Sequence, residues 1–167
     1  MDPFTTHMAQ HVVIGDLVPI AVTLLFGPRV PRALGLAALP VWLANLTAWH
    51  IPAVFDAALR HTWLHALQHL ALLGAGLLLW SAILGPPLGI GARLVLVATM
   101  MLAGIVLSTI LLWWPRVLYD QTASLTDQRV GGGLMLLEGM VVALTVGAWL
   151  VFTLLRESEE ASVSPSP

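Results

Sequence analysis

Long apolar stretches are the feature that most limits what this chain can fold into. A transmembrane helix needs about 20 consecutive, predominantly apolar residues. Five stretches meet or approach that length, at residues 6–26, 33–49, 63–84, 92–114 and 132–155. Only 10% of the residues are charged, against about 25% in soluble proteins, which leaves too little polar surface for a fold in water. We therefore predict an all-α, polytopic transmembrane bundle of about five helices, in one domain over residues 1–156.

Turn-forming residues separate these predicted helices. The breaks are Gly27-Pro28, Gly85-Pro86-Pro87, Pro115 and the glycines 131–133. Proline inside a membrane helix is tolerated because neighbouring helices satisfy the freed backbone groups, so Pro19 and Pro40 fit within their helices. The end of the chain, residues 157–167, is acidic and then rich in Ser and Pro. That composition predicts a disordered tail.

The arginines indicate the orientation, because cytoplasmic loops carry an excess of basic residues. If the N-terminus lies outside, the cytoplasmic side holds Arg29, Arg32, Arg93 and Arg156, and the other side holds Arg60, Arg116 and Arg129. We therefore expect an N-out, C-in protein surrounded by membrane lipid. Trp49, Trp63, Trp113, Trp114 and Tyr119 would then form an aromatic belt at the outer interface. The sequence has no basic cluster, so nucleic acid is not an expected partner.

The histidines of this chain all belong to one end of the predicted bundle. His7 and His11 begin the first helix, His50 ends the second, and His61, His65 and His69 begin the third. In an antiparallel bundle these three places share one membrane face, whichever way the chain is oriented. Asp127, which precedes the fifth predicted helix, shares that face too.

The spacing of the histidines favours a metal site. His7 and His11 are four residues apart, and so are His61 and His65, and His65 and His69. Side chains four apart on a helix are neighbours, about 5–6 Å between Cβ atoms, so two imidazoles can reach one ion. His65 and His69 also run into the apolar stretch, where polar side chains are costly and usually face the bundle interior. The alternative is that these histidines pack at the interface or face lipid headgroups.

The ligand types narrow the choice of metal. The sequence has no cysteine, which excludes thiolate sites. Imidazoles together with the thioether of Met8 suit copper, as Cu(I) or Cu(II). Zinc would accept histidines with a carboxylate such as Asp127, and is the less favoured ion. Haem held between two histidines also remains an alternative, and so do plain packing for Met8 and a helix cap for Asp127.

Two acids, Asp16 and Glu138, lie inside predicted membrane helices. An intramembrane acid indicates a functional group such as a proton or ion relay, because an unpaired one facing lipid is costly. The alternative is a protonated packing residue, and the sequence does not decide between the two. We expect Asp16 to face the bundle interior.

A series of short, ordered motifs carries a family resemblance. They are His7-Met8-Ala9-Gln10-His11, Pro19, Gly27-Pro28, His50-Ile51-Pro52, Phe55-Asp56, Leu64-His65, Gln68-His69, Trp80, and Asp127-Gln128 followed by glycines, Met135 and Gly139. Together they resemble the core of the caa3-type cytochrome c oxidase assembly factors, the membrane copper-handling proteins called CtaG. The resemblance covers most of the chain. Family members usually carry additional helices before the His-Met motif, and many have Trp where Leu136 stands here.

The resemblance implies a copper-binding assembly factor or chaperone, and no enzyme. It would sit in the bacterial inner (cytoplasmic) membrane and deliver copper on the extracytoplasmic side, to a cytochrome c oxidase subunit or another copper protein. The metal-site positions that it carries over are His7, Met8, His11, His50, His65, His69 and Asp127. This chain starts almost at the His-Met motif, so the resemblance leaves open whether a partner or a homo-oligomer completes the bundle. The alternatives are a His-metal membrane enzyme, a copper transporter and a bis-His haem protein.

Overall fold

The computed structural model describes residues 3–27, 30–86, 88–120, 122 and 124–163, and the regular secondary structure of this part of the chain is all helical, with no strand. The first helix is one continuous rod of α1 (Pro3–Val12), η1 (Val13–Leu17) and α2 (Val18–Phe26). The others are α3 (Arg32–His50), α4 (Pro52–Arg60), α5 (Thr62–Leu84), α6 (Ile90–Trp113) and α7 (Leu125–Val163). Pro28, Arg29, Pro87 and residues 164–167 of the expected tail lie outside the described residues.

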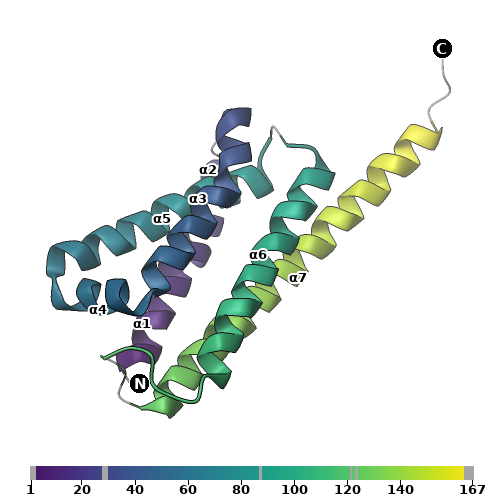
Figure 1. The fold of residues 1–167 in the computed structure, drawn as a ribbon. Helices are drawn as coiled ribbons and strands as arrows, with labels where there is room; N and C mark the ends of the chain where they lie inside the picture. Colours follow the sequence, from purple (N-terminus) through teal and green to yellow (C-terminus); the bar gives the residue numbers. More distant parts are fainter. Residues whose placement is uncertain (1–2, 28–29, 87, 121, 123, 164–167) are drawn as a thin grey trace.

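Four of these helices are long and apolar enough to cross a membrane: Pro3–Phe26, Thr62–Leu84, Ile90–Trp113 and Leu125–Ser162. α3 and α4 pass the same test only as a pair, bent by 74°. The predicted all-α bundle is thus confirmed, with four to five candidate membrane spans. The long helices run up and down, and the two termini lie at opposite ends (Figure 1).

The short helix α4 has no counterpart in the sequence prediction, which ended the second span near Trp49. Ile51 is extended, with φ −66° and ψ 124°, and separates α3 from α4. The cause is Pro52, because the residue before a proline is driven out of the helical region, while proline itself suits the first turn of a new helix. α4 buries Phe55, Asp56 and Ala58 and crosses the end of the bundle where the N-terminus lies (Figure 1).

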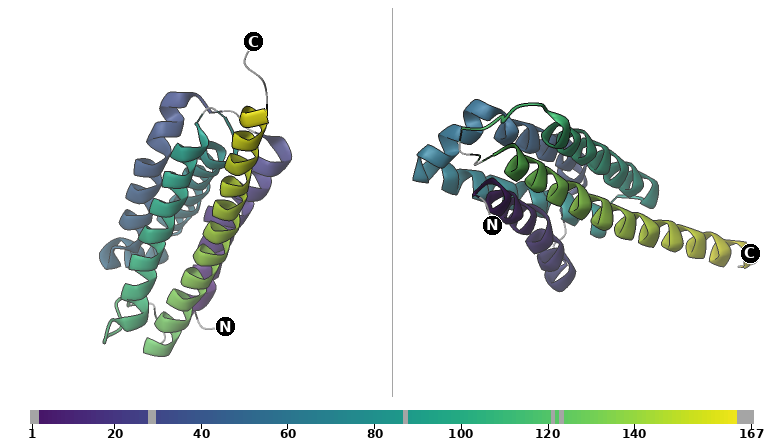
Figure 2. Two further views of the ribbon diagram at one scale, coloured as in Figure 1. Left: turned by 90° about the vertical axis from the view of Figure 1, so that its right-hand side faces the viewer. Right: turned by 90° about the horizontal axis from the view of Figure 1, so that it is seen from below.

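The last helix extends beyond the predicted residues 132–155 in both directions. It begins at Leu125, because the Ser124 hydroxyl caps it by accepting a hydrogen bond from the Asp127 backbone N–H at 3.1 Å. It continues to Val163, so residues 157–163 are helical where a disordered tail was expected. Glu and Ala are good helix formers, and they dominate this stretch. Figure 2 shows α7 projecting past the other helices.

A π-helical turn interrupts the first helix where Asp16 precedes Pro19. Pro19 has no N–H to donate, and the Val18 N–H reaches Val13 O, five residues back. At this turn the helix lies directly against α5: a Cβ on Gly76 would overlap the Gly15 carbonyl oxygen and lie 2.8 Å from Pro19 Cγ. Small residues permit such close approach in membranes. The contact fixes the spacing between two helices that both carry histidines.

The buried apolar side chains form two clusters at different depths. The larger one includes Trp42, Leu79, Trp80, Val97 and Leu150, and it occupies the half of the bundle away from the N-terminus. We call the smaller one the aromatic cluster; its buried members are Phe4, Met8, Phe55, Leu111 and Tyr119. It lies at the end where α1 and α7 begin, which is also the end to which the histidines belong.

Candidate metal centre

Five histidines converge from three helices beside the aromatic cluster. The ring centroids are 4.3 Å apart for His7–His11, 5.2 Å for His7–His65, 4.4 Å for His65–His69, 5.9 Å for His7–His69, 6.0 Å for His11–His69 and 5.8 Å for His11–His50. The rings therefore form one continuous group. The expected meeting of the α1 and α5 pairs is found in the structure, and α3 adds His50.

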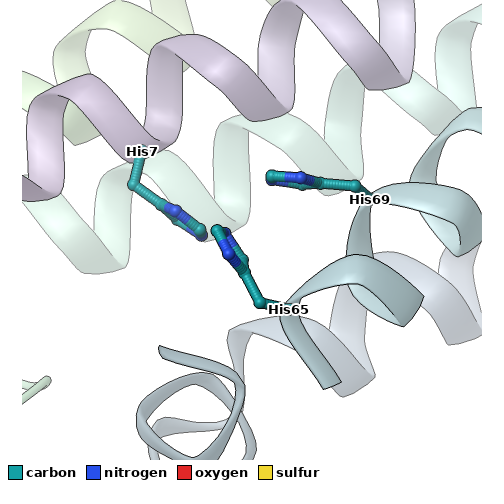
Figure 3. Close-up of side chains that lie close together, drawn as sticks. All are labelled: His7, His65 and His69. Carbon is teal, nitrogen blue, oxygen red and sulfur yellow. The ribbon is translucent and has the colours of Figure 1, made fainter. Parts of the chain in front are cut away.

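Within this group, His7, His65 and His69 are placed to share one ion. One ring nitrogen from each lies within 4.8 Å of the others. Figure 3 shows the His7 ring from α1 pointing toward the two rings from α5. His7 is buried, and His65 and His69 are partly buried. Three imidazoles form a donor set that suits zinc or copper.

Six ring nitrogens of the group lack hydrogen-bond partners among the described residues. This holds for Nε2 of His7, His50, His65 and His69, and for both ring nitrogens of His11, all of which are buried. A buried polar atom without a partner costs free energy, and native structures rarely leave one so. A metal ion held by the lone pairs would remove that cost.

The tautomer of His50 is set by a hydrogen bond along its own helix. His50 Nδ1 lies 2.8 Å from the Leu46 carbonyl oxygen. A carbonyl only accepts, so the proton is on Nδ1 and the buried Nε2 carries a free lone pair. Metal-ligating histidines typically bind a carbonyl in this way with the second nitrogen.

Aromatic side chains cover the histidines at the end of the bundle. Phe4, Phe55 and Tyr119 contact one another, with centroid distances of 5.7, 5.2 and 4.4 Å. The edge of His7 meets Phe55 at 5.1 Å. Tyr119 donates a hydrogen bond to the His50 carbonyl at 3.1 Å, and burial raises the pKa of Tyr119, so the phenol keeps its proton.

This cover corrects part of the expected aromatic belt. Trp49 and Tyr119 are buried in the protein, and Tyr119 packs against Phe55 of α4 in the aromatic cluster. Trp63, Trp113 and Trp114 are exposed, as a belt requires.

Asp127 holds the beginning of α1. Its carboxylate accepts hydrogen bonds from the Phe4 N–H at 3.1 Å, the Thr5 N–H at 2.9 Å and the Thr5 hydroxyl at 2.7 Å. The negative charge also lies at the positive end of the helix dipole. The carboxylate thus acts on His7, two residues further along α1, through the backbone. A place for Asp127 among the ligands remains a prediction.

Met8 and His61, the other two candidates, have different surroundings. Met8 is fully buried in the aromatic cluster and packs on α7, where a Cβ on Gly131 would lie 3.1 Å from Met8 Cγ. Its contacts are those of a packing residue, and a ligand role remains a prediction. His61 is exposed at the junction of α4 and α5, outside the group of five.

Gln68 belongs to the centre and was not among the predicted site residues. Its side chain is fully buried and lies against His7 and His11. The available signal was a polar residue directly before His69 in an apolar helix, where polar side chains usually face the interior.

A cavity of about 80 Å³ lies next to the histidines, between the first helix, α3, α6 and α7. His11 and His50 line one end, and Asp16, Glu138 and Met100 lie deeper. Asp16 accepts a hydrogen bond from Trp80 Nε1 at 3.0 Å, so it faces the interior as expected, and Trp80 is its partner there. Glu138 Oε1 is buried without a hydrogen bond.

The family model for the cytochrome c oxidase caa3 assembly factors (Caa3_CtaG) matches residues 33–157, which is more than half of the chain. The chain therefore belongs to that family. The matched range contains His50, His65, His69 and Asp127, whereas His7 and His11 precede it. No curated protein and no solved structure matches the chain.

Proposed function

We propose that this member of the caa3 oxidase assembly-factor family binds copper as cargo and delivers it during assembly of cytochrome c oxidase. The observation that carries the proposal is the group of His7, His65 and His69, whose ring nitrogens lie within 4.8 Å of one another. Three neutral imidazoles form a donor set that suits copper. The family match supports the oxidase as the recipient.

The half of the bundle away from the histidines is filled with apolar side chains. This favours a protein that holds and delivers copper over one that transports it across the membrane. A transporter would need ligands along the whole path to the opposite face. Among the described residues, the larger apolar cluster, with Leu79, Trp80 and Leu150, fills the bundle beyond the cavity. An ion bound at the histidines would therefore leave from the end where it entered.

The orientation follows from the same arrangement. We propose that the histidine end faces the extracytoplasmic side of the inner membrane, with the N-terminus out and the C-terminus in, as the arginine distribution favours. The recipient is then an oxidase subunit or another copper protein with its metal site on that side. The histidines act as ligands in this proposal, and the chain carries out no catalysis.

Metal analysis of purified variants tests the proposal. Wild-type protein in detergent should retain copper after dialysis, while His7→Ala and His69→Ala should each lose the ion held by this group, because each removes one of its three ligands. His61→Ala is the matched control, since His61 is exposed and outside the group, and it should retain copper like the wild type. Full retention in folded His7→Ala and His69→Ala would overturn the proposed site.

A further inference from the structure

We propose a second copper position, for Cu(I), at the histidine end of the internal cavity, formed by His11 of α1, His50 of α3 and Met135 of α7. It rests on the proposed function, since both positions hold the same cargo. The three residues come from three helices and all line one cavity of about 80 Å³.

The cavity divides the five histidines into two sets. His11 and His50 line it, and the group of His7, His65 and His69 does not. The rings of His11 and His50 have centroids 5.8 Å apart and are nearly perpendicular, at 83°. With metal–nitrogen bonds of about 2.0–2.1 Å, two imidazoles on one ion have centroids roughly 5 to 6 Å apart. The pair has the spacing of two ligands to one ion.

Both rings offer unused lone pairs to the cavity. His11 is 5% exposed and His50 is 7% exposed, and His50 Nε2 and both nitrogens of His11 are buried without hydrogen bonds to any residue that the structure describes. The bond from His50 Nδ1 to the Leu46 carbonyl leaves Nε2 deprotonated. Gln68 lies against His11, but neither its Nε2 nor its Oε1 makes a hydrogen bond among the described residues.

The register of α7 against α1 places Met135 at the depth of His11. The two helices start at the same end and run in the same direction (Figures 1 and 2), and Asp127 lies level with Phe4 and Thr5, to which it bonds. Helices rise about 1.5 Å per residue, so Met135, eight residues after Asp127, lies level with residues 12 and 13. Met135 therefore lies at about the depth of His11; it packs against the aromatic cluster and lines the cavity together with the two imidazoles.

The other methionines of the cavity lie deeper. Gly132 of α7 packs against Leu111 and Ser108 of α6, and α6 runs opposite to α7. Met101, seven residues before Ser108, is therefore about 10 Å further into the bundle at the helix rise of 1.5 Å per residue. It lines the same cavity but is too far away to share an ion with His11 and His50.

The donor set selects the oxidation state. Two neutral imidazoles and a thioether are soft to intermediate donors, and methionine sulfur selects Cu(I) among the biological metals. His11 also lies 4.3 Å, centroid to centroid, from His7 of the first group. An ion can thus pass between the two positions by exchanging one imidazole at a time, without any change of oxidation state.

Anaerobic titration with Cu(I) in competition with a chromogenic chelator, combined with X-ray absorption spectroscopy, tests this inference on the detergent-solubilised chain. Wild-type protein should take up two equivalents and show a sulfur scatterer. Met135→Leu, which nearly conserves volume, should lose one equivalent and the sulfur signal. Met101→Leu, in the same cavity but deeper, should keep both. His65→Ala/His69→Ala should lose the other equivalent and keep the sulfur signal.

The outcomes separate the two proposals. One equivalent bound through nitrogen alone in the wild type would overturn the second position and leave the proposed function standing. No copper uptake by folded wild-type protein would overturn both. A sulfur signal that survives in Met135→Leu would exclude Met135 as the ligand and overturn the site as assigned. Thermal melting of each metal-free variant checks that it is folded.

Discussion

Asp127→Asn tests whether the Asp127 side chain binds the metal directly or positions a residue that does. The carboxylate accepts three hydrogen bonds at the start of α1, from the Phe4 N–H, the Thr5 N–H and the Thr5 hydroxyl. Asparagine keeps one acceptor oxygen but loses the charge, and its amide N–H₂ replaces the oxygen that faces the Phe4 N–H. A donor then faces a donor, while the side-chain volume hardly changes.

The size of the effect follows from these contacts. Loss of a helix cap costs about 0.5–2 kcal/mol, and loss of a charge at a partly buried helix N-terminus costs up to about 2 kcal/mol. We expect Asp127→Asn to destabilise the metal-free protein by about 2–3 kcal/mol. For a chain of this size that lowers Tm by roughly 5–10 °C. Copper affinity should fall as well, because the first turn of α1 positions His7.

Hydrogen exchange on the metal-free protein is the assay that isolates the capping role. The amides at the start of α1 should exchange faster in Asp127→Asn than in the wild type. Asp120→Asn is the matched control: Asp120 is exposed and pairs with exposed Arg60 at 3.5 Å, a contact worth little, so exchange and Tm should hardly change. Unchanged exchange and Tm in metal-free Asp127→Asn, with copper affinity still lost, would refute the capping argument and favour direct ligation.

Three further substitutions or conditions have defined outcomes. Gly76→Ala should lower Tm and copper affinity, since overpacking typically costs about 1–3 kcal/mol and the new Cβ would push the first helix away from α5. Gly74→Ala is the control and should be neutral, because a Cβ on Gly74 would have nothing within 4 Å. Equal Tm values for the two variants would contradict the close contact between Gly76 and the first helix. Met8→Leu should retain copper by elemental analysis, because Met8 is fully buried among aromatic side chains and is not among the residues that line the cavity; loss of copper from folded protein would make it a ligand. Copper retention after equilibrium dialysis should fall once acid protonates the imidazoles, because protonated imidazole cannot bind metal; full retention by folded protein at about three pH units below the unperturbed imidazole pKa of about 6.5 would argue against histidine ligation.

The sequence predicts the all-α bundle and the shared end of the histidines for simple physical reasons. Apolar length defines a membrane helix, and alternation of direction alone puts the start of the first helix beside the start of the third. Neither argument depends on side-chain packing, which is why His7 and His11 could be expected near His65 and His69.

The parts that the sequence missed depend on packing or on a single local contact. α4 is too short to register as a span, and only the extended Ile51 before Pro52 separates it from α3. The early start of α7 depends on the Ser124 cap. The hydrogen bonds of Asp127 to α1 join residues more than 120 positions apart, and no spacing rule reveals such a partner.

The metal group spans the gap between two helices, and this couples its affinity to their separation. His7 belongs to α1, while His65 and His69 belong to α5. A molecule that binds better when these helices are apart weakens copper binding. By thermodynamic reciprocity, bound copper weakens the binding of that molecule by the same factor. Each tenfold change corresponds to about 1.4 kcal/mol. A recipient that docks at this end and draws α1 away from α5 would thereby release the ion without competing for each imidazole, so docking and unloading would be one event.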